Sequence, residues 1–192
     1  ALTAERLFGW HAALFPTGRS GMTKIIVGDW RDDSTGPMQV VSGPYGREKV
    51  HYSAPPAPRV AQEMEAFLAW LNAPLATDPV IKAALAHLWF VTIHPFEDGN
   101  GRIARAIADL ALARSEGSSQ RFYSMSAQIR VERNAYYDQL ERTQKGGTDV
   151  TSWILWFLDC LGRAIHGADG VLAAVVAKGQ FWERTAALAL NE

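Results

Sequence analysis

Residues 94–105 read HPFEDGNGRIAR and combine groups that suit phosphate chemistry. The glycine–asparagine–glycine triplet at 99–101 precedes a strongly helix-forming run, so free N–H groups at the helix start would face a bound anion. Arg102 and Arg105 lie three apart near that start, where the helix dipole disfavours positive charge. A bound polyanion would compensate for both charges.

His94 and Asp98 add a base and a hard oxygen ligand to the same stretch. The imidazole of His94 has an ordinary pKa near neutrality, so it can accept a proton from a hydroxyl. Pro95 disfavours helical geometry at His94 and so ends the preceding helix. The Asp98 carboxylate suits Mg²⁺ that bridges phosphates. Together these groups predict phosphoryl or nucleotidyl transfer.

Weaker patterns overlap the same residues. GNGRIA matches a dinucleotide fingerprint after the β-like LWFVTI, but Glu116, the nearby acidic candidate, follows a helix instead of a second strand. A Walker P-loop lacks its Gly-Lys-Ser/Thr ending, and an EF-hand loop fails because Arg102 falls on a ligand position. A plain capped loop explains the glycines and the asparagine, but not His94, Asp98 and the arginines together.

A mostly helical chain with one β-hairpin is expected to position these residues. MQVVSG (38–43) and KVHYS (49–53) flank the turn-rich GPYG and predict a hairpin, which must lean on the rest of the domain. Apolar residues at helical spacing predict helices over 2–14, 60–71, from Asp78 and Pro79 to the motif, 102–114, 127–143, 149–162 and 169–190.

Some side chains in these elements can be assigned to the core. In the very apolar helix that starts near Asp149 we expect inward-facing positions at Trp153, Trp156, Phe157, Leu161 and Ile165. Cys160 reads as a small core side chain rather than a catalytic thiol. His51, in the hairpin, is expected to face solvent, with a target-facing role as the alternative.

The composition bounds the class of protein. With 192 residues, 48% hydrophobic content and a formal net charge of −1, the chain suits one soluble domain and gives no electrostatic case for nucleic acid or anionic membrane. The apolar stretches fall short of the roughly 18–20 residues that cross a bilayer, so we expect no membrane partner. The single Cys160 excludes an internal disulfide and favours a cytoplasmic location.

The segment HPFEDGNGRIAR resembles the Fic motif, HPFx(D/E)GNGRxxR, and matches every fixed position. The resemblance extends to the hairpin, where the family carries its target-binding flap. It also extends to SAQIRVERNAYYDQLERTQ, which is similar to the helix that surrounds the adenine base. It implies a Fic-type helical bundle with one hairpin flap, and transfer of AMP from ATP, with Mg²⁺, to a Ser, Thr or Tyr hydroxyl of a target protein.

The resemblance also implies roles, position by position. His94 would be the general base, and Asp98 would hold Mg²⁺. The remaining nucleotide-site residues would be Phe96, which anchors the loop in the core, Glu97, Gly99, Asn100 and Gly101 at the α/β-phosphates, Arg102 and Arg105 at the terminal phosphates, and Tyr136, Tyr137 and Gln144 at the base wall. Ordinary core packing remains an even alternative for one of the two tyrosines. Gln144 departs from the asparagine common in some members.

The resemblance implies one Fic domain over 1–192, with an N-terminal helix in 1–15, a core over 16–165 and a C-terminal helix in 169–192. Because the chain begins with alanine and TAALALNE stops inside a helical pattern, we expect a piece of a longer protein. Its PTG, GPYG and LNE features resemble relatives that append a DNA-binding-like winged helix, so nucleic acid would enter only through a domain outside this chain.

Several functional alternatives stay open. The family's inhibitory motif, (S/T)xxxE(G/N), does not occur in this sequence, because Glu116 is followed by glycine but preceded four residues earlier by Leu112. The inhibitor would then be lacking, removed with a missing terminus, or supplied by another chain. The pocket could serve a nucleotide-sensing regulator, or a relative that transfers another phosphate-containing group or removes AMP. We expect a target protein to dock on the hairpin near 38–53, and a homodimer remains open.

Overall fold

The computed structural model describes residues 1–44, 46–74, 77–117 and 121–186 of the chain. Its elements, in order, are α1 (Ala4–Leu14), β1 (Arg19–Ser20), β2 (Thr23–Lys24), β3 (Gln39–Ser42), β4 (Lys49–Ser53), α2 (Ala57–Asn72), α3 (Pro79–Ile93), α4 (Asn100–Glu116), α5 (Met125–Val131), α6 (Arg133–Lys145) and α7 (Thr151–Ala186).

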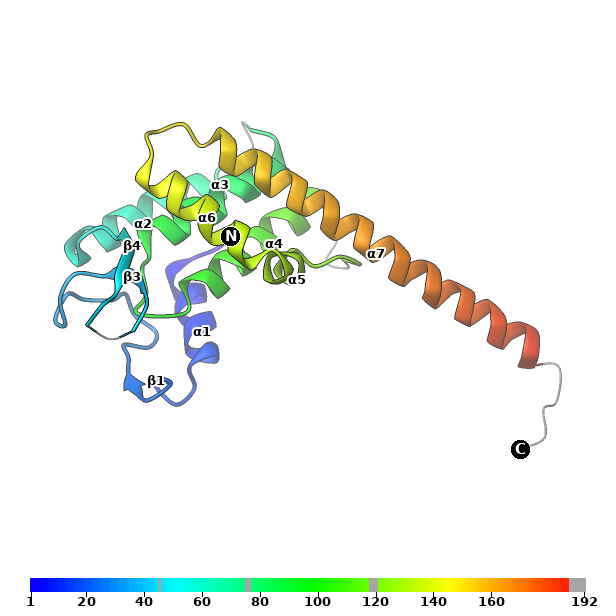
Figure 1. The fold of residues 1–192 in the computed structure, drawn as a ribbon, viewed down its shortest axis with the longest axis horizontal. Coiled ribbons are helices and arrows are strands. Elements are labelled where there is room, and N and C mark those ends of the chain that lie inside the picture. The colour runs from blue at the N-terminus through cyan, green and yellow to red at the C-terminus, as the bar shows by residue number, and fades with distance from the viewer. Residues whose placement is uncertain (45, 75–76, 118–120, 187–192) are drawn as a thin grey trace.

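The predicted mostly helical fold with one hairpin flap is confirmed (Figure 1). Strands β3 and β4 pair antiparallel, with an irregularity between Val40 and Val41. A second, shorter antiparallel pair, β1 with β2, was not predicted. Tyr45, in the hairpin turn, and the end of the predicted C-terminal helix at 187–192 lie outside the described residues.

Helix α3 lies at the centre of the bundle, against α2, α4 and α7. Its small residues, such as Ala83 and Ala84, are fully buried and let the neighbouring helices approach closely. Trp153 of α7 packs onto this face and donates its indole N–H to the carbonyl of Ala84 at 2.8 Å. A helix that is apolar on all sides is expected to be buried on all sides.

Both ends of α3 are fixed by local chemistry. The Asp78 carboxylate accepts from the N–H groups of Val80 and Ile81, and Pro79 occupies the first helical position, as predicted. At the other end the chain turns at His94, which adopts the left-handed conformation with φ 52° and ψ 56°. The helix therefore delivers His94 at its C-terminus and lets the motif loop begin there.

The predicted helix over 127–143 is broken at Glu132 into α5 and α6, so its expected continuity was wrong. The Glu132 carboxylate accepts from Arg163 of α7 at 2.7 and 2.6 Å and from Gln128 at 2.5 Å. The bonds from Arg163 attach the break between α5 and α6 to α7. The direction of α6, which carries the predicted base wall, is therefore set from outside its own sequence.

The two predicted helices at 149–162 and 169–190 instead form one helix, α7, of 36 residues. The intervening Gly162, Gly167 and Gly170 do not interrupt it, because one glycine inside a helix costs only about 1 kcal/mol. The residues Trp153, Trp156, Phe157 and Leu161 are buried as predicted. Ile165 is 42% exposed, contrary to prediction, because α7 leaves the bundle there (Figure 1).

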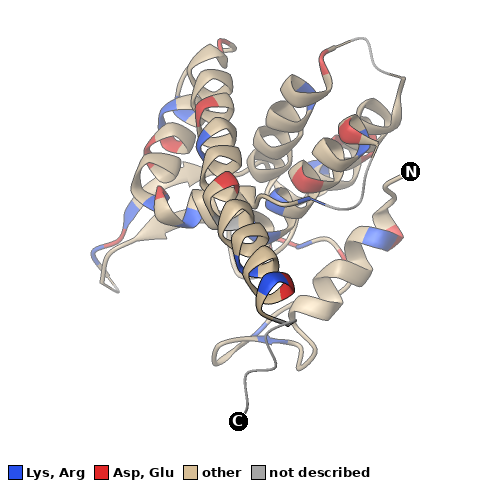
Figure 2. Cartoon of the chain, turned by 90° about the vertical axis from the view of Figure 1, so that its right-hand side faces the viewer, with Lys and Arg blue, Asp and Glu red and all other residues tan. Residues whose placement is uncertain are grey.

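Helix α7 also bears on the expectation that no stretch could cross a bilayer. By length and composition alone, Thr151–Thr185 could span one, contrary to the expectation from the apolar runs. A single such helix is weak evidence, and the first part of α7 lies in the protein core. That the protein has no membrane partner stays a prediction. Charged residues of both signs are distributed over the helices in the view of Figure 2.

Candidate active site

The loop between α3 and α4 presents His94 in a defined chemical state. His94 Nδ1 lies 3.1 Å from the carbonyl oxygen of Val91, which can only accept, so Nδ1 carries the hydrogen and Nε2 keeps a free lone pair. Burial lowers the pKa of His94, and the charge of Arg31 acts in the same direction, against the contact with Val91 and the charge of Asp98. His94 is therefore neutral at pH 7, as a proton acceptor must be.

The underside of the loop is held by aromatic packing. Phe96 is fully buried, as predicted for a loop anchor, and the ring of His11 stacks on it with centroids 4.1 Å apart. His11 Nδ1 accepts from the N–H of Gly28 at 3.3 Å, so Nε2 donates to the carbonyl of Asp98 at 3.2 Å. Burial lowers the pKa of His11 and favours this neutral form. His11 was given no role from sequence.

Asn100 closes the loop on itself. Its side-chain oxygen accepts from the N–H of Phe96 at 2.9 Å, and its side-chain N–H donates to the carbonyl of Phe96 at 2.7 Å. Asn100 is 2% exposed, so both amide ends are engaged inside the protein. In this structure the Asn100 side chain shapes the loop, while its backbone N–H belongs to the start of α4.

Gly99 has a conformation and a position that require glycine. Its φ is +82°, and a Cβ atom there would lie 2.9 Å from a ring carbon of Phe15. The first backbone hydrogen bond of α4 runs from the N–H of Ile103 to the carbonyl of Gly99, at 3.0 Å. The N–H groups of residues 100–102 therefore point out of the start of α4, as an anion site needs.

Asp98 has the chemistry expected of a magnesium ligand. Its carboxylate accepts from the N–H of Gly99 at 2.5 Å and from the hydroxyl of Ser20, yet the side chain stays 47% exposed. Within the described residues, no three His, Cys, Asp or Glu side chains form a metal site. One exposed carboxylate fits Mg²⁺, which keeps several waters and takes its other ligands from substrate phosphates.

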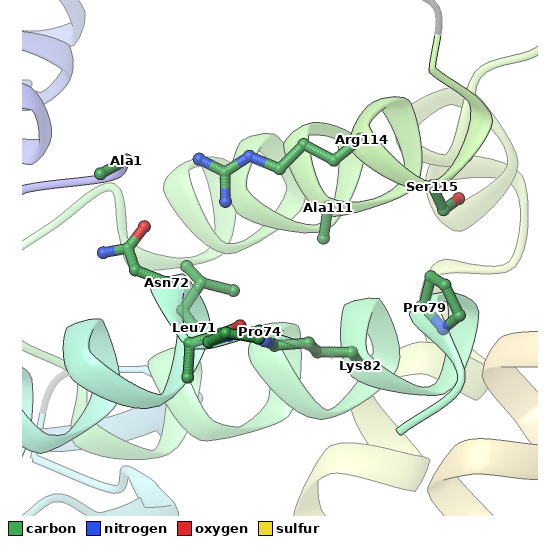
Figure 3. A pocket seen from close by; sticks show the side chains of 10 residues that line it. Ala1, Leu71, Asn72, Pro74, Pro79, Lys82, Ala111, Arg114 and Ser115 are labelled. Atoms are coloured by element: carbon green, nitrogen blue, oxygen red, sulfur yellow. The ribbon is translucent and has the colours of Figure 1, made fainter. Parts of the chain in front are cut away.

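Most predicted site residues line one cavity of about 710 Å³, between the hairpin, α6 and the motif loop. Those that line it are His94, Glu97, Asp98, Gly99, Asn100, Gly101, Arg105, Tyr136, Tyr137 and Gln144. Phe96 is absent from the lining because it is buried beneath the loop. Another cavity, of about 440 Å³, contains Lys82 and Arg114 but none of the predicted site residues (Figure 3).

The two motif arginines are placed differently. Arg105 lines the large cavity, while the guanidinium of Arg102 lies over the ring of Phe15, 4.7 Å from its centroid. An Arg102 nitrogen also lies 3.8 Å from an Asp98 oxygen, so this arginine stands beside the site without lining the cavity. Glu97 is engaged as well, since its carboxylate accepts from the N–H of Ile26 at 2.6 Å.

The predicted base wall contains one core tyrosine and one exposed tyrosine. Tyr136 is 3% exposed, and its hydroxyl lies 3.0 Å from Nε2 of His87. Burial, and secondarily the charge of Arg105, lowers the pKa of His87 to about 3. Tyr137 is 49% exposed at the cavity. The predicted alternative, that one of the two tyrosines packs in the core, therefore applies to Tyr136.

The hairpin is tied to this wall by side-chain contacts. His51 Nδ1 lies 2.5 Å from a carboxylate oxygen of Glu141, and Nε2 lies 2.6 Å from the hydroxyl of Ser42. His51 is therefore partly buried against α6, and the prediction that it faces solvent was wrong. Hydrogen bonds from Lys145 and His51 lower the pKa of Glu141 to about 2.

Thr92, in the last turn of α3, joins the hairpin and the wall. Its backbone carbonyl accepts from the Tyr52 hydroxyl at 2.7 Å, and its side-chain oxygen accepts from the Gln144 amide at 3.2 Å. Neither contact was anticipated from sequence. Because Thr92 lies two residues before His94, both contacts act close to the base.

The sequence model of the Fic/DOC family matches residues 1–112, and the chain belongs to this family. It is 33% identical over 131 residues to the protein adenylyltransferase Fic of Culex quinquefasciatus, covering 66% of this chain and 25% of that protein. The corresponding protein of Nematostella vectensis is 34% identical over 149 residues, covering 75% and 32%. The chain thus spans a quarter to a third of these relatives.

Solved structures agree with this assignment. A Fic family protein from Desulfovibrio desulfuricans G20 superposes with a TM-score of 0.71 at 27% identity, covering 88% of this chain and 47% of that one. Fic-1 from C. elegans superposes with a TM-score of 0.64, covering 91% and 45%. At 23% identity, the second comparison supports the fold alone.

Proposed function

We propose that the chain transfers AMP from ATP to a Ser, Thr or Tyr hydroxyl of a target protein and releases pyrophosphate. One observation carries this proposal: His94, with its free Nε2, and Asn100 and Gly101, whose backbone N–H groups point out of the start of α4, line the same cavity. The names of the curated relatives support the same reaction, although the chain spans only part of their length.

The proposed mechanism assigns each step to residues of this chain. The hydroxyl of the target gives its proton to His94 Nε2 while its oxygen attacks the α-phosphorus of ATP. The bond from that phosphorus to the α/β-bridging oxygen breaks, and pyrophosphate leaves. The N–H groups at the start of α4 and the charge of Arg105 would stabilise the phosphates. Mg²⁺, when held at Asp98, would offset phosphate charge.

Strand β3 offers a place for the target. In the described part of the chain β3 pairs only with β4, and residues 38–42 line the same cavity as His94. An extended target segment that adds to the free edge would gain main-chain hydrogen bonds with little dependence on its side chains. An exposed edge normally favours aggregation, so its retention here is consistent with a docking use.

Transfer of AMP can be distinguished from transfer of phosphate and from nucleotide sensing. The purified chain is incubated with candidate target proteins and ATP labelled at either the α- or the γ-phosphate. Retention of the α-label alone on protein supports AMP transfer. Retention of the γ-label indicates phosphate transfer, and binding of ATP without retained label under all conditions indicates a sensor.

The role of His94 has its own test. His94→Ala should lower transfer by about 10² to 10⁴, the range for a positioned base, because the ring acts on the incoming hydroxyl. Calorimetry should show ATP affinity within a few-fold of the wild type. His166→Ala, on the exposed part of α7, is the matched control and should change neither quantity. Loss of ATP binding in His94→Ala would show that the ring is a binding group.

A further inference from the structure

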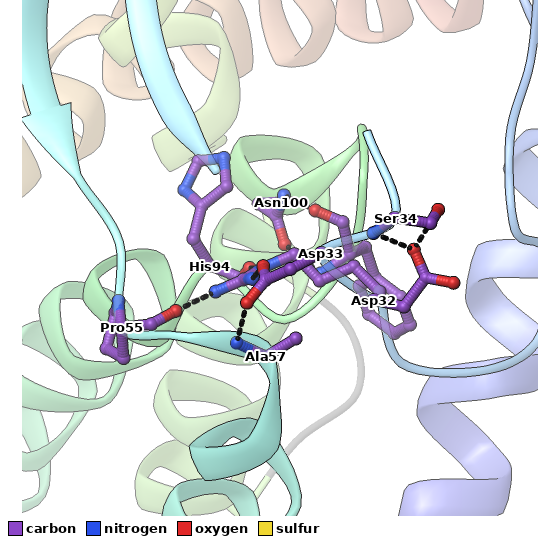
Figure 4. A network of polar contacts seen from close by, with 9 residues as sticks. Asp32, Asp33, Ser34, Pro55, Ala57, His94 and Asn100 are labelled. Atoms are coloured by element: carbon purple, nitrogen blue, oxygen red, sulfur yellow. Dashed lines mark hydrogen bonds and ion pairs between the residues drawn. The ribbon is translucent and has the colours of Figure 1, made fainter. Parts of the chain in front are cut away.

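Arg31 is a buried cation that the reaction described above does not use. It is 3% exposed and lies in the segment between β2 and β3, far from the motif in sequence. Its guanidinium reaches the motif loop, where Nε donates to the backbone carbonyl of His94 at 2.7 Å. Its backbone N–H donates to the carbonyl of Pro95 at 2.9 Å, so Arg31 holds two successive carbonyls. Figure 4 shows His94, Asp33, Pro55 and Ala57, the labelled residues of this network.

The other guanidinium nitrogens connect the loop to the base of the flap. One donates to the carbonyl of Pro55, which follows β4, and one pairs with Asp33 at 3.2 Å. The second oxygen of Asp33 accepts from the N–H of Ala57 at 2.8 Å, at the start of α2. A buried guanidinium with a partner on each of its three nitrogens fixes the geometry of what it touches, because a broken bond would leave a desolvated charge.

His94 is the residue that most needs such support. Among the described residues it is the only non-glycine with a positive φ. Non-glycine residues rarely adopt the left-handed backbone region, and such a conformation persists only where the surrounding contacts hold it. The conformation sets the direction in which the ring leaves the chain, and therefore where Nε2 lies in the cavity.

We propose that Arg31 is a positioning residue for the base: its bonds to the His94 and Pro95 carbonyls hold His94 in the left-handed conformation from which Nε2 accepts the target's proton. This proposal rests on the proposed transfer for its kinetic consequences. A purely structural role, in which Arg31 only joins the flap base to α2, makes a different prediction. It would change the amount of folded protein without separating chemistry from nucleotide binding.

Kinetics with the whole chain distinguish the two roles. Arg31→Lys keeps the charge but loses the fork that spans His94 and Pro55. Its kcat for transfer should fall by about 10²-fold, as for a reacting group displaced by about 1 Å, while KM for ATP stays within about twofold. Asp33→Asn, which loosens the guanidinium without removing it, should lower kcat by a smaller factor. If Arg31→Lys does not fold, the kcat of Asp33→Asn tests the proposal in its place.

Rescue and a control complete the kinetic test. Added methylguanidinium should restore part of the transfer lost in Arg31→Ala, because the small cation can occupy the vacated site. Arg59→Lys, which changes an arginine paired with Glu63 on the exposed face of α2, should leave kcat and KM unchanged. The proposal is overturned if folded Arg31→Lys and Asp33→Asn both keep kcat within twofold of the wild type.

A readout independent of transfer separates this proposal from the proposed function. In ¹⁵N NMR spectra at pH 7, the His94 ring, assigned by its loss in His94→Gln, should show protonated Nδ1 and unprotonated Nε2. In Arg31→Lys these signals should move toward an exchanging mixture of tautomers. Unchanged His94 signals in that variant contradict the positioning role even where wild-type protein transfers AMP. A changed tautomer supports it even where the wild type transfers nothing.

Discussion

Replacing Gly99 by alanine should destabilise the protein through two separable effects. A left-handed conformation costs an alanine about 1–2 kcal/mol. The new Cβ would also lie 2.9 Å from Phe15, and ring movement is restricted because His11 lies 5.0 Å away and Arg102 covers the ring at 4.7 Å. Overpacking of this kind costs about 1–3 kcal/mol. The sum is about 2–5 kcal/mol.

Thermal unfolding measures this loss. For a chain of this size, each kcal/mol shifts Tm by about 2–4 °C, so Gly99→Ala should melt roughly 4–20 °C below the wild type. The matched control is Gly162→Ala in α7, where an added Cβ meets nothing within 4 Å. That substitution should stabilise by about 0.5–1 kcal/mol, since alanine is the better helix former.

Circular dichroism melts of the three proteins at pH 7 would suffice. If Gly99→Ala melts at or above the wild-type Tm, the loop does not require glycine for the reasons given. If both variants lose stability equally, the contact with Phe15 is not the cause.

Two further predictions follow from the histidines and the hairpin. With its pKa lowered to about 3 by burial, His87 stays neutral in the folded protein while the unfolded chain protonates near pH 6.5. Stability should therefore fall below pH 6.5 by about 1.4 kcal/mol per pH unit more steeply than in His87→Gln, as urea unfolding at pH 4–7 would show; equal slopes would exclude a buried neutral ring. In β3, proline at Val40 or at Val41, tested one at a time, should abolish target modification in one register and spare ATP binding in both. Full transfer in both variants would mean that the edge does not dock the target.

Local signals in the sequence predicted the parts of the fold that local chemistry determines. The Asp78–Pro79 helix start and the hairpin strands follow from residues next to one another in the chain, while the burial of Phe96 was implied by the resemblance to the Fic motif. The break at Glu132 did not, because it depends on Arg163, 31 residues away in α7. The continuity of α7 was missed because its glycines suggested an end, although each internal glycine costs only about 1 kcal/mol and the surrounding alanines and leucines favour the helix.

The site was predicted unevenly for the same reason. The motif identified the loop, since its glycines, acid, base and arginines are consecutive. Arg31 and His11 were not predicted because they bind backbone carbonyls 63 and 87 residues away. Since every residue has a backbone carbonyl, the sequence does not show which one a distant side chain will bind. The burial of Tyr136 and the exposure of Tyr137 likewise depend on the angle of α6.

The two contacts of Thr92 have a thermodynamic consequence. One residue receives a hydrogen bond from the flap, through Tyr52, and one from the base wall, through Gln144. In the proposed reaction, a nucleotide that orders the wall and a target that orders the flap would therefore act on the same helical turn. Linkage is reciprocal, so whatever factor the nucleotide applies to the affinity for the target, the target applies to the affinity for the nucleotide. Removing the Tyr52 hydroxyl would reduce that coupling free energy, because it removes the hydrogen bond that joins the flap to α3.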